Sequence, residues 1–135
     1  MYGEKLLRAE DGVEGMDLII VEMKAGLTDL LNLYQEMLDI SRRASGFLEK
    51  GDWEALNTTI CSHMATQKKI DNHQQAITAL HSEMRRRGHE SDTEIDGMVK
   101  EVLGTIEQIQ AEVHGNEEKL RRAVAKVQTE MGDLK

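Results

Sequence analysis

The stretch EKGDWEAL, residues 49–56, separates two long segments whose apolar residues recur at helical spacing. Gly51 can adopt the left-handed conformation that ends a helix. Asp52 can accept hydrogen bonds from the free amides that begin the next helix. Trp53, the only tryptophan of the chain, would then stand at the first position of the second helix. We expect its ring to fold back over the end of the first helix, near Leu48, and to seal the closed end of a helical hairpin.

Residues 13–50, before this turn, carry apolar residues in alternating steps of four and three. This heptad pattern is typical of a helix that packs in coiled-coil fashion. The seam consists of Met16, Ile20, Met23, Leu27, Leu30, Tyr34, Met37, Ser41, Ala44 and Leu48. Because further apolar residues flank the seam on more than one side, we expect this helix to contact two neighbours.

Residues 52–87, after the turn, predict a second helix with a less apolar seam. The seam consists of Trp53, Leu56, Ile60, His63, Gln67, Ile70, Gln74, Ile77, His81 and Met84. Either its polar members lie at the rim, or they help to form a mixed groove that adapts to a partner helix. In the first case the buried face turns toward Met64, Ile77, Leu80 and Met84. The basic run 85–87 and Gly88 mark the end of this helix.

Residues 91–134 predict the third helix and carry the most regular seam of the chain. Ser91 and Glu94 have the S-x-x-E spacing of a capping box, which begins a helix. The seam consists of Ile95, Val99, Val102, Ile106, Ile109, Val113, Asn116, Leu120, Ala123, Val127, Glu130 and Leu134. Because a polar residue within an apolar seam most often sets register, we expect Asn116 to fix helix register or oligomeric state.

Together the three segments predict an all-α fold, an elongated antiparallel bundle of three long helices with coiled-coil-like packing. The chain of 135 residues suits a single domain, residues 1–135, in which residues 1–12 form a loose leader. The composition agrees with this fold class. The chain has no proline, 3% aromatic residues and 31% charged residues, a balance that is typical of long helices.

The charge and cysteine content narrow the class of partner and the compartment. A formal net charge of −8 disfavours nucleic acid as a partner, because an acidic surface repels phosphates. The single cysteine, Cys61, indicates a reducing compartment. The apolar stretch 16–23 is too short to insert into a membrane, and the chain starts without the pattern of a signal peptide. We therefore expect a cytoplasmic protein.

The sequence carries no motif of catalysis or of cofactor binding. It lacks the spacing of a zinc or di-iron site, a glycine-rich phosphate loop and a nucleophile elbow. The nearest cluster of possible metal ligands is Cys61, His63, His73 and His81. His63 and His81 would lie ~27 Å apart along one helix, too far to share an ion. We expect neither an enzyme nor a bound cofactor.

Residues 34–56, YQEMLDISRRASGFLEKGDWEAL, resemble the flagellar export chaperones of the FliT type and, more loosely, those of the FlgN type. The matching positions are Tyr34, Leu38, Ser41, Leu48, Gly51, Asp52, Trp53 and Leu56. Residues 99–124 are similar in rhythm to the C-terminal helix of both families. The NEEKL at 116–120 is similar to the N-x-x-L element of the FlgN type.

The resemblance implies a small cytoplasmic chaperone that holds a late flagellar subunit, either a filament-cap or a hook-junction protein. Such a chaperone binds the C-terminal helical segment of its client, prevents premature assembly and delivers the client to the type III export apparatus. In FliT-type members the last helix can cover the client groove. The uninterrupted helix 91–134 departs from that type and puts a separate autoinhibitory helix in doubt.

A client helix needs a groove lined with apolar residues at helical spacing. We expect this groove between the second and third helices. Its lining would consist of Ile60, Ile70, Ile77, Met84, Val99, Val102, Ile106 and Ile109. The turn would be built by Tyr34, Gly51, Asp52, Trp53 and Leu56. The alternative is a structural homodimeric coiled-coil adaptor without an export client, which the seam of residues 91–134 alone would support.

Overall fold

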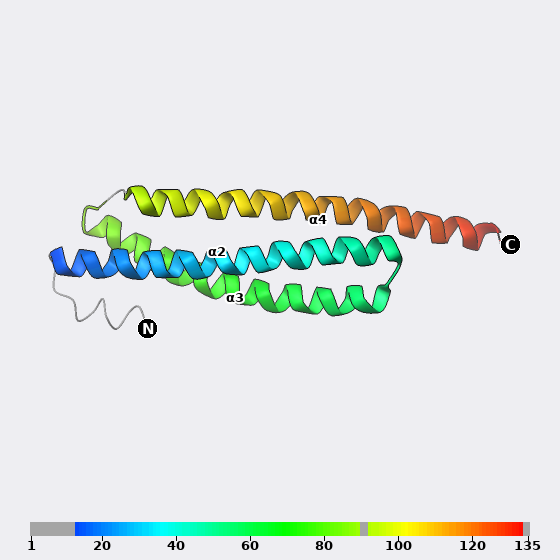
Figure 1. Cartoon of the computed structure of the whole chain (residues 1–135), viewed down its shortest axis with the longest axis horizontal. Coiled ribbons are helices and arrows are strands. Elements are labelled where there is room, and N and C mark those ends of the chain that lie inside the picture. The colour runs from blue at the N-terminus through cyan, green and yellow to red at the C-terminus, as the bar shows by residue number, and fades with distance from the viewer. Residues whose placement is uncertain (1–12, 90–91, 134–135) are drawn as a thin grey trace.

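A computed structural model describes residues 13–89 and 92–133. It contains three long helices and, within these two ranges, no strand: α2 (Val13–Lys50), α3 (Trp53–Arg86) and α4 (Thr93–Asp133). The predicted all-α bundle is confirmed (Figure 1), and each helix begins and ends within two residues of its predicted bounds. The proposed leader, residues 1–12, lies outside the described residues.

Helix α2 is the centre of the molecule. Helix α3 runs antiparallel to it and α4 runs parallel to it (Figure 1), and both pack along its length. Among the described residues α3 and α4 share only sparse contacts with each other. The expectation that the first helix contacts two neighbours is therefore confirmed, and it explains why α2 is apolar on more than one side.

The turn between α2 and α3 closes as the GDW sequence predicts. Gly51 has a φ of 68°, and the N–H of Asp52 donates to the carbonyl of Phe47 at 3.0 Å. Together with the bond from Gly51 N–H to the Leu48 carbonyl, this is a Schellman motif. Asp52 Oδ1 accepts a hydrogen bond from Ala55 N–H at 3.1 Å, so Asp52 caps α3, which begins at Trp53.

The turn between α3 and α4 also begins with a glycine in the left-handed conformation. Gly88 has a φ of 82° and ends α3 after the basic run. Asp92 then caps α4, because its Oδ1 accepts hydrogen bonds from the N–H groups of Glu94 and Ile95 at 3.0 and 3.1 Å. The bond from Ile95 is the main reason that the pKa of Asp92 is lowered. The predicted cap, Ser91, lies outside the described residues.

Glu94, the other member of the predicted capping box, binds elsewhere. Its carboxylate lies 2.6 Å from Lys24 Nζ and so joins the start of α4 to α2. Asp92 thus caps α4 and Glu94 forms an inter-helix ion pair, while the predicted capping box depends on Ser91 and lies outside the described residues. The hydrogen bond between Lys24 and Glu94 is also the main reason that the pKa of Lys24 is raised.

Two buried clusters form the core. The first lies toward the α3–α4 turn and consists of Ile19, Met23, Leu27, Leu80, Met84 and Ile95. The second lies in the middle of the molecule and consists of Leu30, Tyr34, Met37, Ile70 and Val102. In the second cluster Gln74 Nε2 donates a hydrogen bond to the hydroxyl of Tyr34. Burial raises the pKa of Tyr34.

The buried face of α3 differs from the predicted seam. It consists of Thr59, Thr66, Ile70, Leu80 and Met84. The predicted shift of this face toward Leu80 and Met84 is correct, but Met64 is 67% exposed and does not belong to it. Small polar residues thus occupy the first half of the face, near the α2–α3 turn. The Thr59 hydroxyl bonds within its own helix, to the carbonyl of Ala55 at 2.8 Å.

Helix α4 is longer than the surface that α2 offers to it. Lys24–Glu94, Arg42–Glu112 and Glu49–Lys119 are ion pairs whose members lie 70 positions apart. The end of α2 at Lys50 is therefore level with Leu120. Residues 121–133 extend past the hairpin (Figure 1), a projection of about 20 Å at the α-helical rise. We call residues 121–133 the α4 tip.

Candidate functional site

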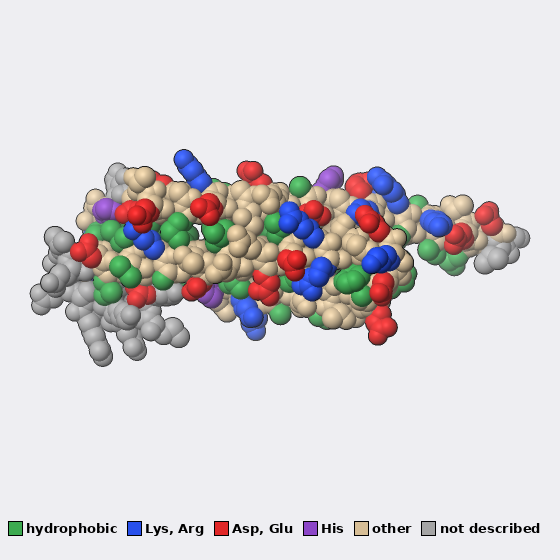
Figure 2. Space-filling model, viewed as in Figure 1, with side chains coloured by type: hydrophobic (Ala, Val, Ile, Leu, Met, Phe, Trp, Pro, Cys, Tyr) green, Lys and Arg blue, Asp and Glu red, His purple; other side chains and the backbone are tan. Residues whose placement is uncertain are grey.

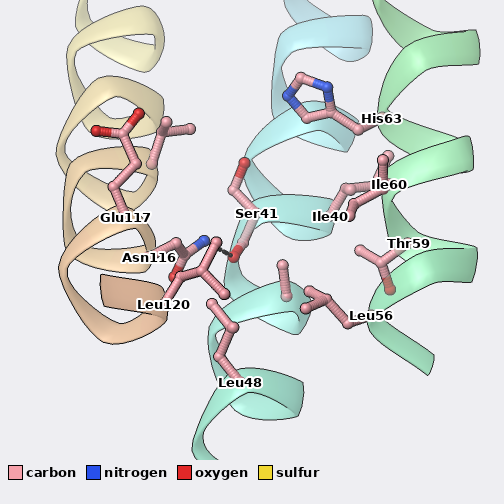
Figure 3. Close-up of a pocket in the computed structure, with 12 residues that line it drawn as sticks. Ile40, Ser41, Leu48, Leu56, Thr59, Ile60, His63, Asn116, Glu117 and Leu120 are labelled. Carbon is pink, nitrogen blue, oxygen red and sulfur yellow. Dashed lines mark hydrogen bonds between the residues drawn. The ribbon is translucent and has the colours of Figure 1, made fainter. Parts of the chain in front are cut away.

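At the hairpin end the three helices surround an open cleft of about 260 Å³ (Figure 3). Helix α2 contributes Ile40, Ser41, Ala44 and Leu48. Helix α3 contributes Leu56, Thr59, Ile60 and His63, and α4 contributes Val113, Asn116, Glu117 and Leu120. Most of these side chains are apolar, and they come from segments far apart in the sequence.

The cleft exists because small residues occupy the seams at this end. Toward the α3–α4 turn, Leu80, Met84 and Ile95 fill the space around α2. At the hairpin end the facing positions are Ser41, Ala44 and Thr59, which cannot reach across the gap between α3 and α4. The apolar residues of the walls consequently stay accessible: Ile60 is 49% exposed and Leu120 is 44% exposed.

The wall shared by α2 and α4 contains polar atoms without partners. Asn116 Nδ2 donates to the backbone carbonyl of Ser41 at 2.9 Å (dashed in Figure 3), and this bond ties α4 to α2. Asn116 Oδ1 and Ser41 Oγ are buried and find no hydrogen-bond partner within the described part of the chain. Buried polar atoms of this kind are usually satisfied, so these two make the wall less stable than a fully bonded one.

An ion pair borders the cleft on its outer side. Lys119 Nζ lies 2.5 Å from Glu49 Oε1 and also contacts the Ser45 hydroxyl. The hydrogen bond from Lys119 lowers the pKa of Glu49. These contacts and the Asn116 bond hold the parallel α2 and α4 in register, as predicted for Asn116, beside a cleft that is otherwise apolar.

The structure places most of the predicted groove residues in the core. Ile70, Met84 and Val102 are buried, and Ile77, Ile106 and Ile109 are half-buried against the two clusters. Val99 is exposed but does not line the cleft, and only Ile60 does. The groove prediction failed because α3 and α4 use their apolar seams against α2 and not against a shared client surface.

The predicted turn residues have separate positions. Gly51 and Asp52 build the turn, Leu56 lines the cleft, and Tyr34 lies in the central cluster. Trp53 begins α3, but its side chain is 50% exposed. The seal that its ring was expected to form over the hairpin end stays a prediction, and Leu48, which it was to cover, lines the open cleft.

Several cleft residues were not predicted as a site. Ser41 and Ala44 appear in the sequence as the small members of an apolar seam, and Leu120 appears in the NEEKL element. Their shared signal is a drop in side-chain size at consecutive seam positions of α2. Interpreted in this way, the sequence would have pointed to the hairpin end.

Other classes of site leave no trace in the described helices. Among residues 13–89 and 92–133, His, Cys, Asp and Glu side chains nowhere gather in a group that could hold a metal ion. None of the three helices has an apolar run long enough to span a bilayer. Cys61 is an exposed free thiol.

Comparisons of the chain with protein-family models, with curated proteins and with solved structures found no match.

Proposed function

We propose that the protein binds an amphipathic helix of a partner in the cleft and serves as a cytoplasmic export chaperone for a late flagellar subunit. The observation that carries this proposal is the open apolar cleft at the hairpin end, bounded by all three helices. The flagellar assignment rests on the resemblance of residues 34–56 to FliT-type and FlgN-type chaperones.

The shape of the cleft favours a helix as ligand. Ser41, Ala44 and Leu48 follow one another at steps of three and four, so they form one face of α2 between the flanking α3 and α4. A fourth helix laid on this face would complete a four-helix bundle. Because Ser41 and Ala44 are small, the backbone of the incoming helix can approach α2 closely.

The chemistry of the lining specifies the incoming face. Leu56, Ile60 and Leu120 suit apolar side chains spaced at i, i+3, i+4 and i+7.

The test is capture of a client. The chain would be co-expressed with filament-cap and hook-junction proteins of the same genome, full length and without their C-terminal helices, and the complexes would be purified and sized. We expect capture of one client and loss of capture when its C-terminal helix is removed. Delivery to the type III export apparatus would then be measured as secretion of that client.

Matched variants locate the binding site. Ile60→Glu puts a charge on the cleft wall and should abolish capture, whereas Met64→Glu, one turn along α3 and outside the cleft, should not. Both side chains are largely exposed, so both variants should stay helical by circular dichroism. Capture that survives Ile60→Glu would show that the client binds elsewhere.

A second candidate function is supported by a different observation. The α4 tip exposes apolar residues beyond the hairpin, as a homodimeric coiled-coil adaptor would. Failure to capture any flagellar client, together with a stable dimer, would favour this adaptor over the chaperone.

A further inference from the structure

The α4 tip and the residue just before it carry an apolar stripe that no described helix covers. Leu120, Val124, Val127 and Met131 are 44%, 49%, 48% and 61% exposed. They follow at steps of four, three and four and continue the side of α4 that packs against α2. Figure 2 shows hydrophobic side chains gathered along one edge of the projecting end of α4.

We propose that this stripe is a dimerisation surface on which the tips of two copies of the chain pair antiparallel. In an antiparallel coiled coil the two kinds of seam position alternate across the interface. One register pairs Leu120 with Met131 of the second copy and Val124 with its Val127. The same register repeats both pairs on the other side of a twofold axis, so the four stripe residues of each copy are all matched.

The charge pattern of the tip selects the antiparallel direction. Arg121, Arg122 and Lys126 make the first part of the tip basic, and Glu130 and Asp133 make its end acidic. Antiparallel pairing places the basic part of each copy against the acidic end of the other. Parallel pairing would instead align like charges.

The stripe is self-complementary in spacing and charge, a property that an isologous interface requires and a binding site for an unrelated helix does not. It spans fewer than two heptads, so the dimer is reversible and depends on concentration. The pairing does not rest on the proposed chaperone function: Leu120 belongs to both surfaces, but Ile60 and the α3 wall of the cleft take no part in the pairing.

The experiment measures apparent mass by light scattering across a range of concentrations. The wild-type chain should rise to twice the mass of one chain. Val127→Glu should stay at the mass of one chain, because a charge would replace an apolar layer, while its helicity remains that of the wild type. Met64→Glu, the matched control on α3, should behave as the wild type. A single-chain mass for the wild type at every concentration, or a Val127→Glu dimer, would overturn the proposal.

Disulfide trapping tests the direction. In a Cys61→Ser background, Val124→Cys and Val127→Cys chains carrying different tags would be mixed and oxidised with diamide. Antiparallel pairing predicts that the mixed disulfide dominates over either like-with-like product. Predominance of the like-with-like disulfides would indicate a parallel pair and contradict the register.

Discussion

The two ends of this bundle have opposite interiors. At the end toward the α3–α4 turn, Leu80, Met84 and Ile95 fill the space beside α2. At the hairpin end, Ser41, Ala44 and Thr59 stand at the facing positions and leave an open cleft. The cleft thus lies at the end where three facing seam positions carry small side chains.

The largest expected difference in stability between core and cleft comes from replacing an isoleucine of α3 by glutamate, once in the core and once in the cleft. Ile70 is fully buried and Ile60 is 49% exposed. Ile70→Glu should lower the free energy of unfolding by about 3–5 kcal/mol, because the carboxylate would be buried without a partner. Urea unfolding followed by circular dichroism measures this loss, and adding Ile77→Glu should deepen it. Ile60→Glu should change the free energy of unfolding by less than ~1 kcal/mol. Equal losses would mean that the cleft is closed in solution.

Filling the cleft should make the hairpin end resemble the other end. Ala44→Leu adds methylene groups to the cleft and should stabilise the fold by about 1 kcal/mol, since each buried CH₂ contributes ~0.8 kcal/mol and the site is partly open. It should also block client capture. Ala65→Leu makes the same change at an exposed position of α3 and should do neither. Destabilisation by Ala44→Leu would show that the cleft is too narrow for the added side chain.

Removing the hydrogen bond between Asn116 and Ser41 tests how strongly α4 is held to α2 at the hairpin end. Asn116→Ala deletes the hydrogen bond to the Ser41 carbonyl and should cost about 1 kcal/mol of unfolding free energy. Gln110→Ala, an exposed amide on the same helix, serves as the control in the same urea titration. An unchanged midpoint for Asn116→Ala would assign the register of α4 to its ion pairs instead.

The smallest predicted effect is electrostatic and lies at the packed end. Hydrogen bonds from Arg86 and Arg87 lower the pKa of Glu83 to about 2. A carboxylate with a lowered pKa stabilises the fold above its ordinary pKa of about 4.5, and this stabilisation is lost as the pH falls toward about 2. Glu83→Gln should therefore reduce the loss of stability on acidification.

The size of this acid effect is limited by solvent. Because the ion pairs of Glu83 lie near the surface, their contribution should stay below ~1 kcal/mol. Urea midpoints at neutral pH and near pH 3 measure it, with the exposed Glu107→Gln as control. An identical pH dependence in Glu83→Gln and the wild type would show that these pairs contribute nothing measurable.

The sequence predicts the helices well because their ends carry strong local signals. Gly51 and Gly88 both take the left-handed conformation, and Asp52 caps as expected. The central position of α2 also follows from its apolar residues on more than one side. These features depend on neighbours along the chain, so a single sequence contains enough information to find them.

The site could not be predicted in the same way. The buried face of α3 includes Thr59 and Thr66, which a search for apolar periodicity passes over, so the predicted seam was rotated around the helix. The separation of α3 from α4 is a tertiary property that neither seam encodes. The groove of eight residues was therefore predicted between α3 and α4, although both helices pack on α2 and share few contacts with each other. The flagellar assignment stays a prediction that the co-expression experiment tests.

The central position of α2 has a consequence for how the molecule comes apart. Because α3 and α4 are each anchored on α2 and only sparsely on each other, α4 can detach while the α2–α3 hairpin keeps its own contacts. Native-state hydrogen exchange should then resolve two opening units. Amides of α2 should exchange only on global unfolding, those of α4 at a lower free energy, and those of residues 121–133 fastest of all. Pairing of the α4 tip with a second copy would slow that last group alone.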